Sequence, residues 1–162
     1  MGTMAEYEIQ FFGASSRPPD ALAADFYDSF EGVLASRCGR LSVTVDATSD
    51  APIDTATRIA DRLETLGIHV LRVDPDLVDA TEIATRLGRT RQNVQQWATG
   101  ARQVAFPSPL AVVGGKRIWP WAEIVQWANQ HLGFDENSGL LLDEAAIVNA
   151  NLVNQRDVAL LT

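Results

Sequence analysis

The chain has 162 residues, of which 46% are hydrophobic and 21% are charged, so it can bury a sizeable core. This composition excludes an intrinsically disordered chain, and no apolar run is long enough to predict a membrane span. We see no signal peptide, and a single cysteine, Cys38, excludes an internal disulfide, so a cytoplasmic protein is expected.

The first part of the chain predicts four strands and two helices. Runs of β-branched and apolar residues predict strands at residues 7–12, 33–36, 41–45 and 68–73. Residues 33–36 are also compatible with the tail of the first helix. That helix begins near Asp20, and its expected buried face consists of Leu22, Phe26, Tyr27 and Phe30. A second helix is expected over residues 53–66. The order β-α-β-β-α-β is that of a ferredoxin-like sandwich, in which two helices cover one face of an antiparallel sheet.

The chain then predicts two short helices joined by a tight turn. Asp79 or Thr81 can cap the first of these helices, and Gly88 lies where the chain turns. Thr90 is a natural cap for the second helix, which is expected to cover residues 91–99.

The sizes of four residues in this stretch follow the helix-turn-helix pattern of DNA-binding proteins. The small Ala84 is followed by Gly88, then by Val94, and then by the apolar Trp97 at the spacing that the motif requires. A small residue opposite Val94 lets two crossing helices touch closely. An ordinary helical hairpin is the alternative interpretation.

Two apolar runs around Gly114-Gly115 predict a tight hairpin, and Pro120 suits the first turn of a following helix. With Phe106-Pro107-Ser108-Pro109 before the hairpin and Trp119 to Trp127 after it, the stretch 79–132 resembles the AlpA and excisionase branch of the MerR-like winged helix-turn-helix proteins. The whole chain is also similar to a group of uncharacterised bacterial helix-turn-helix proteins that carry an α+β domain in front of the winged motif. These resemblances imply DNA binding, but no particular operator or effector.

We therefore predict an α+β protein in three parts. These are a ferredoxin-like domain over residues 1–76, a winged helix-turn-helix over 77–132, and a C-terminal helix within 133–162. The apolar stripe of that last helix docks on its own chain or pairs with a second copy, and it consists of Leu141, Ala145, Val148 and Leu152. A homodimer is expected, with this stripe as the favoured contact, because helix-turn-helix proteins usually bind two-fold sites.

Charge is distributed unevenly along the chain. Residues 79–117 carry a net charge of +4, although the whole chain carries −8, because residues 1–78 contribute −7 and residues 118–162 contribute −5. Contact with DNA phosphates requires a local basic surface of this kind. A solvated basic face is the alternative, and its coincidence with the helix-turn-helix favours the DNA interpretation.

The second helix of the motif is expected to read base edges in the major groove. At about 100° per residue, Gln92 and Gln96 point away from the buried side, with Asn93 and Gln95 on the flanks. The alternative is that these amides merely solubilise an exposed face. The expected DNA contacts are Arg89, Thr90, Arg91, Gln92, Asn93, Gln95, Gln96, Arg102, and the wing residues Lys116 and Arg117.

No phosphate-binding loop, metal-ligand spacing or catalytic group is recognisable, so we expect no cofactor, no metal ion and no enzymatic activity. The favoured hypothesis is a sequence-specific double-stranded-DNA-binding regulator of bacterial or phage origin, associated with the nucleoid when it is bound to DNA. A competing hypothesis is a modulator or antitoxin that binds a partner protein through its N-terminal domain. A third makes that domain a small-molecule sensor, on fold analogy alone.

Overall fold

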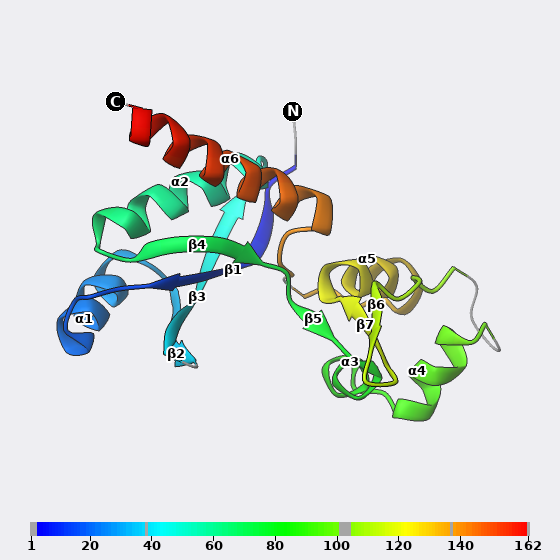
Figure 1. The fold of residues 1–162 in the computed structure, drawn as a ribbon. Helices are drawn as coiled ribbons and strands as arrows, with labels where there is room; N and C mark the ends of the chain where they lie inside the picture. Colours follow the sequence, from blue (N-terminus) through cyan, green and yellow to red (C-terminus); the bar gives the residue numbers. More distant parts are fainter. Residues whose placement is uncertain (1–2, 38, 101–104, 137, 162) are drawn as a thin grey trace. The chain divides into compact units, whose positions relative to one another are not determined.

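The structure is a computed structural model that describes residues 3–37, 39–100, 105–136 and 138–161. It is a mixed α+β protein with antiparallel sheets, and it divides into two compact units (Figure 1). The first unit comprises Met1–Asp74 and Leu142–Thr162, and the second comprises Pro75–Leu141. The sequence predicted that residues 133–162 form a third part. In the structure, Leu142–Thr162 belong to the same compact unit as the N-terminal residues. Among the described residues, no helix has the length and apolar character that crossing a membrane requires.

The first unit is built on a four-stranded antiparallel sheet with the strand order β2-β3-β1-β4. Its elements follow the predicted order and are β1 (Ala5–Ala14), α1 (Pro19–Ser29), β2 (Gly32–Arg37), β3 (Arg40–Ser49), α2 (Pro52–Thr65), β4 (His69–Asp74) and the C-terminal α6 (Leu142–Leu161). Residues 33–36 belong to a strand, so the structure decides between the two interpretations of that stretch.

One face of this sheet carries the core of the first unit. Ile9 and Phe11 of β1 are buried beside Val43 and Val45 of β3, while the residues between them are more exposed. On α1 the prediction was wrong for Tyr27, whose side chain is 52% exposed. Its hydroxyl oxygen accepts a hydrogen bond from the backbone N–H of Leu34 on β2, and this bond draws the ring to the margin of the sheet.

The helix α6 packs along α2 and β4 within the first unit (Figure 1). Its residues Ala145, Val148 and Leu152 are buried there. The Oδ1 atom of Asn149 accepts from the backbone N–H of Val73 at 2.8 Å, and Nδ2 donates to the Val73 carbonyl at 3.2 Å. The expectation that this stripe provides a dimer contact is therefore corrected, because these three side chains are already covered by the same chain; Leu141, the fourth residue of the predicted stripe, precedes the helix and is half-buried.

Among its described residues, the second unit contains three helices and a three-stranded antiparallel sheet of order β5-β7-β6. Its elements are β5 (Leu77–Val78), α3 (Ala80–Leu87), α4 (Arg91–Ala98), β6 (Ala111–Val113), β7 (Lys116–Pro120) and α5 (Trp121–Leu132). Gly88 ends α3 in the left-handed conformation with φ of 65°, as the turn requires.

The predicted helix caps are present. The Asp79 carboxylate accepts from the backbone N–H of Glu82 at 2.9 Å, and the Thr90 hydroxyl accepts from the backbone N–H of Asn93 at 3.1 Å. A cluster of aromatic rings holds the helices together, and Trp97, Trp121 and Trp127 are buried in it. The ring centroids of Trp97 and Trp127 lie 5.0 Å apart. These ring contacts fix the position of α4 beside the β6–β7 hairpin.

Candidate nucleic-acid interface

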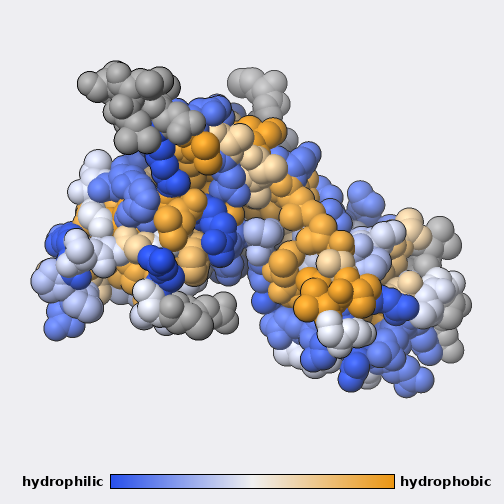
Figure 2. All heavy atoms as spheres, in the orientation of Figure 1, coloured by the Kyte–Doolittle hydropathy of each residue, from blue (hydrophilic) through white to orange (hydrophobic). Residues whose placement is uncertain are grey.

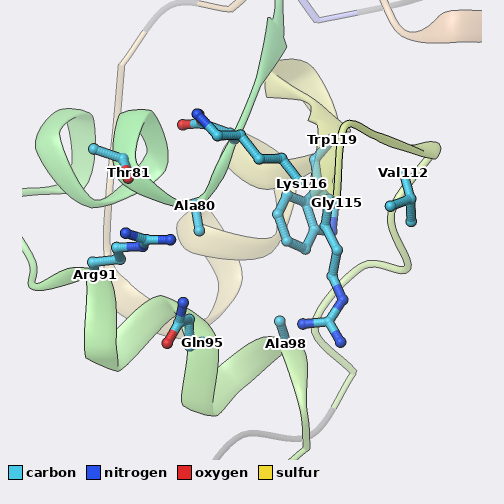
Figure 3. Close-up of a pocket in the computed structure, with 11 residues that line it drawn as sticks. Ala80, Thr81, Arg91, Gln95, Ala98, Val112, Gly115, Lys116 and Trp119 are labelled. Atoms are coloured by element: carbon cyan, nitrogen blue, oxygen red, sulfur yellow. The ribbon is translucent and has the colours of Figure 1, made fainter.

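A groove of about 420 Å³ separates the start of α3 and one side of α4 from the β6–β7 hairpin (Figure 3). In Figure 3, Arg91 and Gln95 project from α4 into a space that the Lys116 side chain overhangs from the hairpin. The lining residues are Asp79, Ala80, Thr81, Arg91, Gln95, Ala98, Val112, Gly115, Lys116, Arg117 and Trp119. One face of α4 and the basic residues of the hairpin thus line the same groove.

The amide side chains of α4 differ in how accessible they are. Val94 and Trp97 are buried, and Gln92 and Gln95 are exposed on the remaining surface of the helix. Gln95, which the sequence placed on the flank, lines the groove beside Arg91. Gln96, expected to point directly outward, is only partly exposed and is not part of the groove lining. The structure therefore brings Arg91 and Gln95 together with the hairpin, and it leaves Gln92 accessible beside them.

Thr90 and Asn93 are occupied with each other at the start of α4. The Thr90 hydroxyl accepts from the Asn93 backbone N–H and donates to the Asn93 Oδ1 atom at 2.8 Å. This pair fixes the first turn of the helix, and a hydrogen bond from a base to Asn93 Oδ1 would compete with the Thr90 hydroxyl. Arg89, in the turn before Thr90, is exposed.

The basic residues of the second unit divide into structural and accessible ones. Arg86 donates to Asp76 at 2.5 Å and to Glu82 at 2.9 Å, and its guanidinium carbon lies 5.0 Å from the centroid of the Trp121 ring. Burial lowers the pKa of Arg86, but the hydrogen bonds to Asp76 and Glu82 outweigh burial and leave the pKa raised. Arg86 therefore has a structural role, and its charge is neutralised within the unit, although it contributes to the net charge of +4 counted over residues 79–117.

The remaining cations lie around the groove and the turn before α4. Within the described ranges no ion pair involves Arg89, Arg91 or Arg117, and all three side chains are exposed. The Nζ atom of Lys116 lies 3.8 Å from an Asp79 carboxylate oxygen, so this lysine is held only loosely at the cap of α3. Arg102, which the sequence included among the expected DNA contacts, lies outside the described residues.

An apolar surface on the hairpin was not anticipated from the sequence. Val112 and Val113 are each 64% exposed, and Leu77 and Leu110 are also exposed. Because Val112 and Val113 are adjacent in β6, their side chains lie on opposite faces of the strand, and Val112 also lines the groove. Figure 2 shows apolar side chains exposed on the second unit. The sequence signal was the apolar run itself, which predicted the strands correctly. The apolar run alone does not predict that these side chains are exposed, because their exposure depends on how few neighbours the hairpin has.

The second unit carries balanced charge, whereas the first unit is strongly acidic. The second unit contains six Lys/Arg and six Asp/Glu residues, whereas the first contains seven Lys/Arg and 15 Asp/Glu residues.

No protein-family model matches this sequence, and no curated protein and no solved structure is significantly similar to it. The described residues contain no cluster of three or more His, Cys, Asp or Glu side chains suited to a metal ion.

Proposed function

We propose that this protein binds double-stranded DNA sequence-specifically and acts as a transcriptional regulator of a bacterium or phage. In this proposal the second unit is a winged helix-turn-helix, with α4 as the recognition helix and the β6–β7 hairpin as the wing. The observation that carries the proposal is the single groove that Arg91 and Gln95 of α4 share with Lys116 and Arg117 of the hairpin.

The chemistry of the groove suits a nucleic acid better than a small apolar ligand. Glutamine can donate to and accept from adenine at the same time, and arginine does the corresponding job on guanine. Lysine and arginine on the hairpin can neutralise phosphates, which positions a protein on the duplex without reading its sequence. The exposed Gln92 and Gln95 supply base-reading groups, and Lys116 and Arg117 supply backbone contacts.

The element order supports the two fold assignments that belong to the proposal. Two helices joined through a left-handed glycine, followed by a hairpin and a third helix, support a winged helix-turn-helix in the second unit. The strand order β2-β3-β1-β4, with α1 and α2 as the connections, supports a ferredoxin-like sandwich in the first unit. DNA binding would locate the protein in the cytoplasm, at the nucleoid.

One observation favours a second candidate function. The exposed Val112 and Val113 are apolar, and a surface of this kind is also typical of protein interfaces. A modulator that binds a partner protein would use these side chains where a DNA-binding protein uses Lys116 and Arg117. In that case replacing Val112 and Val113 by serine would abolish partner binding, and the chain would show no preference among duplexes.

Selection of bound duplexes from a random pool tests the proposal. The full chain is expected to enrich a short motif within a few rounds, and enrichment is expected to disappear in an Arg91→Ala/Gln95→Ala variant. The variant Asn154→Ala/Gln155→Ala, which removes exposed amides from α6, serves as the matched control and should enrich the same motif. A pool that stays random with the unchanged protein would contradict the proposal.

A further inference from the structure

The two edges of the sheet in the first unit differ in how they are finished. The β4 edge is closed by side chains, since Asn149 of α6 pairs with both the N–H and the C=O of Val73. Farther along the same strand, the Glu64 carboxylate accepts from the backbone N–H of Val70 at 3.0 Å. Closure of this kind prevents a further strand from pairing with β4.

The β2 edge carries much weaker protection. β2 contains no proline and no charged residue before its last residue, Arg37, and Val33 is 56% exposed. Charged residues, prolines and bulges are the usual means by which an edge strand avoids pairing with another chain. In the described part of the chain, the one side chain bonded to this edge is Tyr27, whose hydroxyl accepts from the Leu34 N–H at 3.1 Å.

The pairing of β2 with β3 determines which backbone groups point outward. Val33 lies opposite Thr44, and the Glu31 carbonyl accepts from the Asp46 N–H, so the odd-numbered residues of this stretch bond to β3. In an antiparallel ladder the alternate residues then turn their N–H and C=O groups away from the partner strand. These outward residues are Gly32, Leu34 and Ser36, and the bond from Leu34 to Tyr27 agrees with this assignment.

We infer that the β2 edge is the docking surface for a second copy of this chain, which pairs with it as an antiparallel strand about a two-fold axis at Leu34. In this register Leu34 lies opposite Leu34 of the second copy, and Gly32 lies opposite Ser36. All three positions face outward, so the pair forms about six backbone hydrogen bonds.

Two features make a second copy the occupant. The register is self-complementary: Val33 lies beside Ala35 of the other copy, and no like charges oppose each other between Gly32 and Ser36. In addition, β4 is closed, so the sheet of the first unit offers one open edge, and pairing through this sheet stops at a symmetric dimer instead of growing into a fibre.

Tyr27 sets the strength of this contact. Its hydroxyl occupies the Leu34 N–H that the second copy needs, so the ring must turn away before the strands pair. The Tyr27 side chain is about half exposed, so its ring can rotate into solvent. In the structure it packs edge-on against Phe26, with the ring centroids 5.1 Å apart. Because a short strand pair buries little surface, we expect a reversible dimer with a Kd of roughly tens of micromolar.

Sedimentation equilibrium of the full chain without DNA tests the inference, over protein concentrations from about 1 to about 500 µM. The unchanged protein should shift from monomer to dimer. Val33→Lys should remain monomeric, because a charge on an edge strand opposes pairing. The matched control is Val153→Lys on α6, where the valine is 52% exposed; it should dimerise like the unchanged protein. Circular dichroism establishes that both variants are folded.

Tyr27→Phe gives a result of the opposite sign. Loss of the hydroxyl frees the Leu34 N–H in both copies, so the dimer should become roughly tenfold tighter. A protein that stays monomeric throughout would overturn the inference and leave the edge to a strand from another protein. Dimerisation that Val33→Lys does not weaken, or that Tyr27→Phe does not strengthen, would place the contact elsewhere and overturn it as well. None of these measurements involves DNA, so their failure is distinct from a failure of the proposed function.

Discussion

Both α4 and α6 bury an apolar stripe and expose amide side chains, yet only α4 is a candidate reader of DNA. On α6 the exposed amides are those of Asn154 and Gln155, and the first turn carries Asp143 and Glu144. On α4 the exposed amides stand next to Arg91, along a groove that also contains basic hairpin residues. An amide face alone therefore does not distinguish the two helices, and the accessible cations around α4 are what make it the candidate.

The largest effect is expected from removing the buried side of α4. Trp97→Ala should destabilise the second unit by about 3–5 kcal/mol and abolish DNA binding, because it empties the centre of the aromatic cluster. All four tryptophans belong to the second unit, so fluorescence of the remaining three reports on that unit alone. Leu152→Ala on α6 is the matched change in the other unit. If it shifts the fluorescence transition as far as Trp97→Ala does, the two units do not unfold separately.

Truncating exposed amides should separate the two helices functionally. Gln92→Ala or Gln95→Ala should each weaken binding to the selected duplex by about 1–3 kcal/mol and leave binding to unrelated duplexes nearly unchanged. Gln155→Ala on α6 should change neither. Fluorescence anisotropy with the two kinds of duplex measures both quantities. Equal losses on specific and unrelated duplexes would assign these glutamines to the phosphate backbone.

Neutralising the hairpin tests the cations that distinguish the surroundings of α4. Each phosphate contact contributes a slope of about −0.9 to log K against log salt concentration, so Lys116→Ala/Arg117→Ala should make the slope shallower by about two units. The loss should be similar for all duplexes. Arg72→Ala in the first unit, which removes a cation paired with Asp74 at 2.6 Å, is the control and should leave the slope unchanged. A slope that the hairpin variant also leaves unchanged would remove the wing from the interface.

The Asn149 amide of α6 should contribute to the stability of the first unit and not to DNA affinity. Asn149→Ala leaves the N–H and C=O of Val73 without their side-chain partner, at a cost of about 1–2 kcal/mol to the first unit. Urea denaturation followed by circular dichroism measures this loss, and anisotropy should show unchanged DNA affinity. A substantial loss of DNA affinity would mean that α6 contributes to the interface.

The smallest effect concerns the pH dependence of the stability of the first unit. Burial, and then the negative charge of Glu144, raise the pKa of Tyr7. A raised folded pKa means that this contribution to stability is fully present below the unfolded value of about 10, and is lost as the pH rises through the folded value. Thermal melts between about pH 8 and pH 11 should show this loss, and Glu144→Gln should make it smaller. An identical pH profile in Glu144→Gln would exclude the carboxylate as a cause.

Local patterns were sufficient to predict the order of the elements. Alternating and helical apolar spacing predicted every major strand and helix of the first unit, and Asp79, Gly88 and Thr90 marked the ends of α3 and α4. These signals work because capping and left-handed turns depend on neighbouring residues only. Local patterns do not identify the partner of the C-terminal stripe. Periodicity identified Ala145, Val148 and Leu152 as residues that must be covered, but the partner is β4 and α2 of the same chain.

The candidate site was predictable in outline and not in detail. The residue types of α4 and the hairpin indicated the surface, yet helical angles alone favoured Gln96, whereas Gln95 lines the groove. The hairpin determines that choice, and its position depends on contacts between distant residues. Similarly, a charge count cannot distinguish Arg86, which is paired with Asp76, from the accessible Arg91. Ion pairing is a tertiary property, so it becomes visible only when the partners are placed.

Nuclear magnetic resonance of the isotope-labelled full chain, titrated with the selected duplex, tests most directly whether the groove is the DNA interface. Our account predicts that backbone amide signals shift and broaden over α4 (Arg91–Ala98) and the hairpin from Ala111 to Arg117, while the signals of α6 remain in place. Shifts centred on α6 or on the sheet of the first unit, with α4 unaffected, would contradict the account.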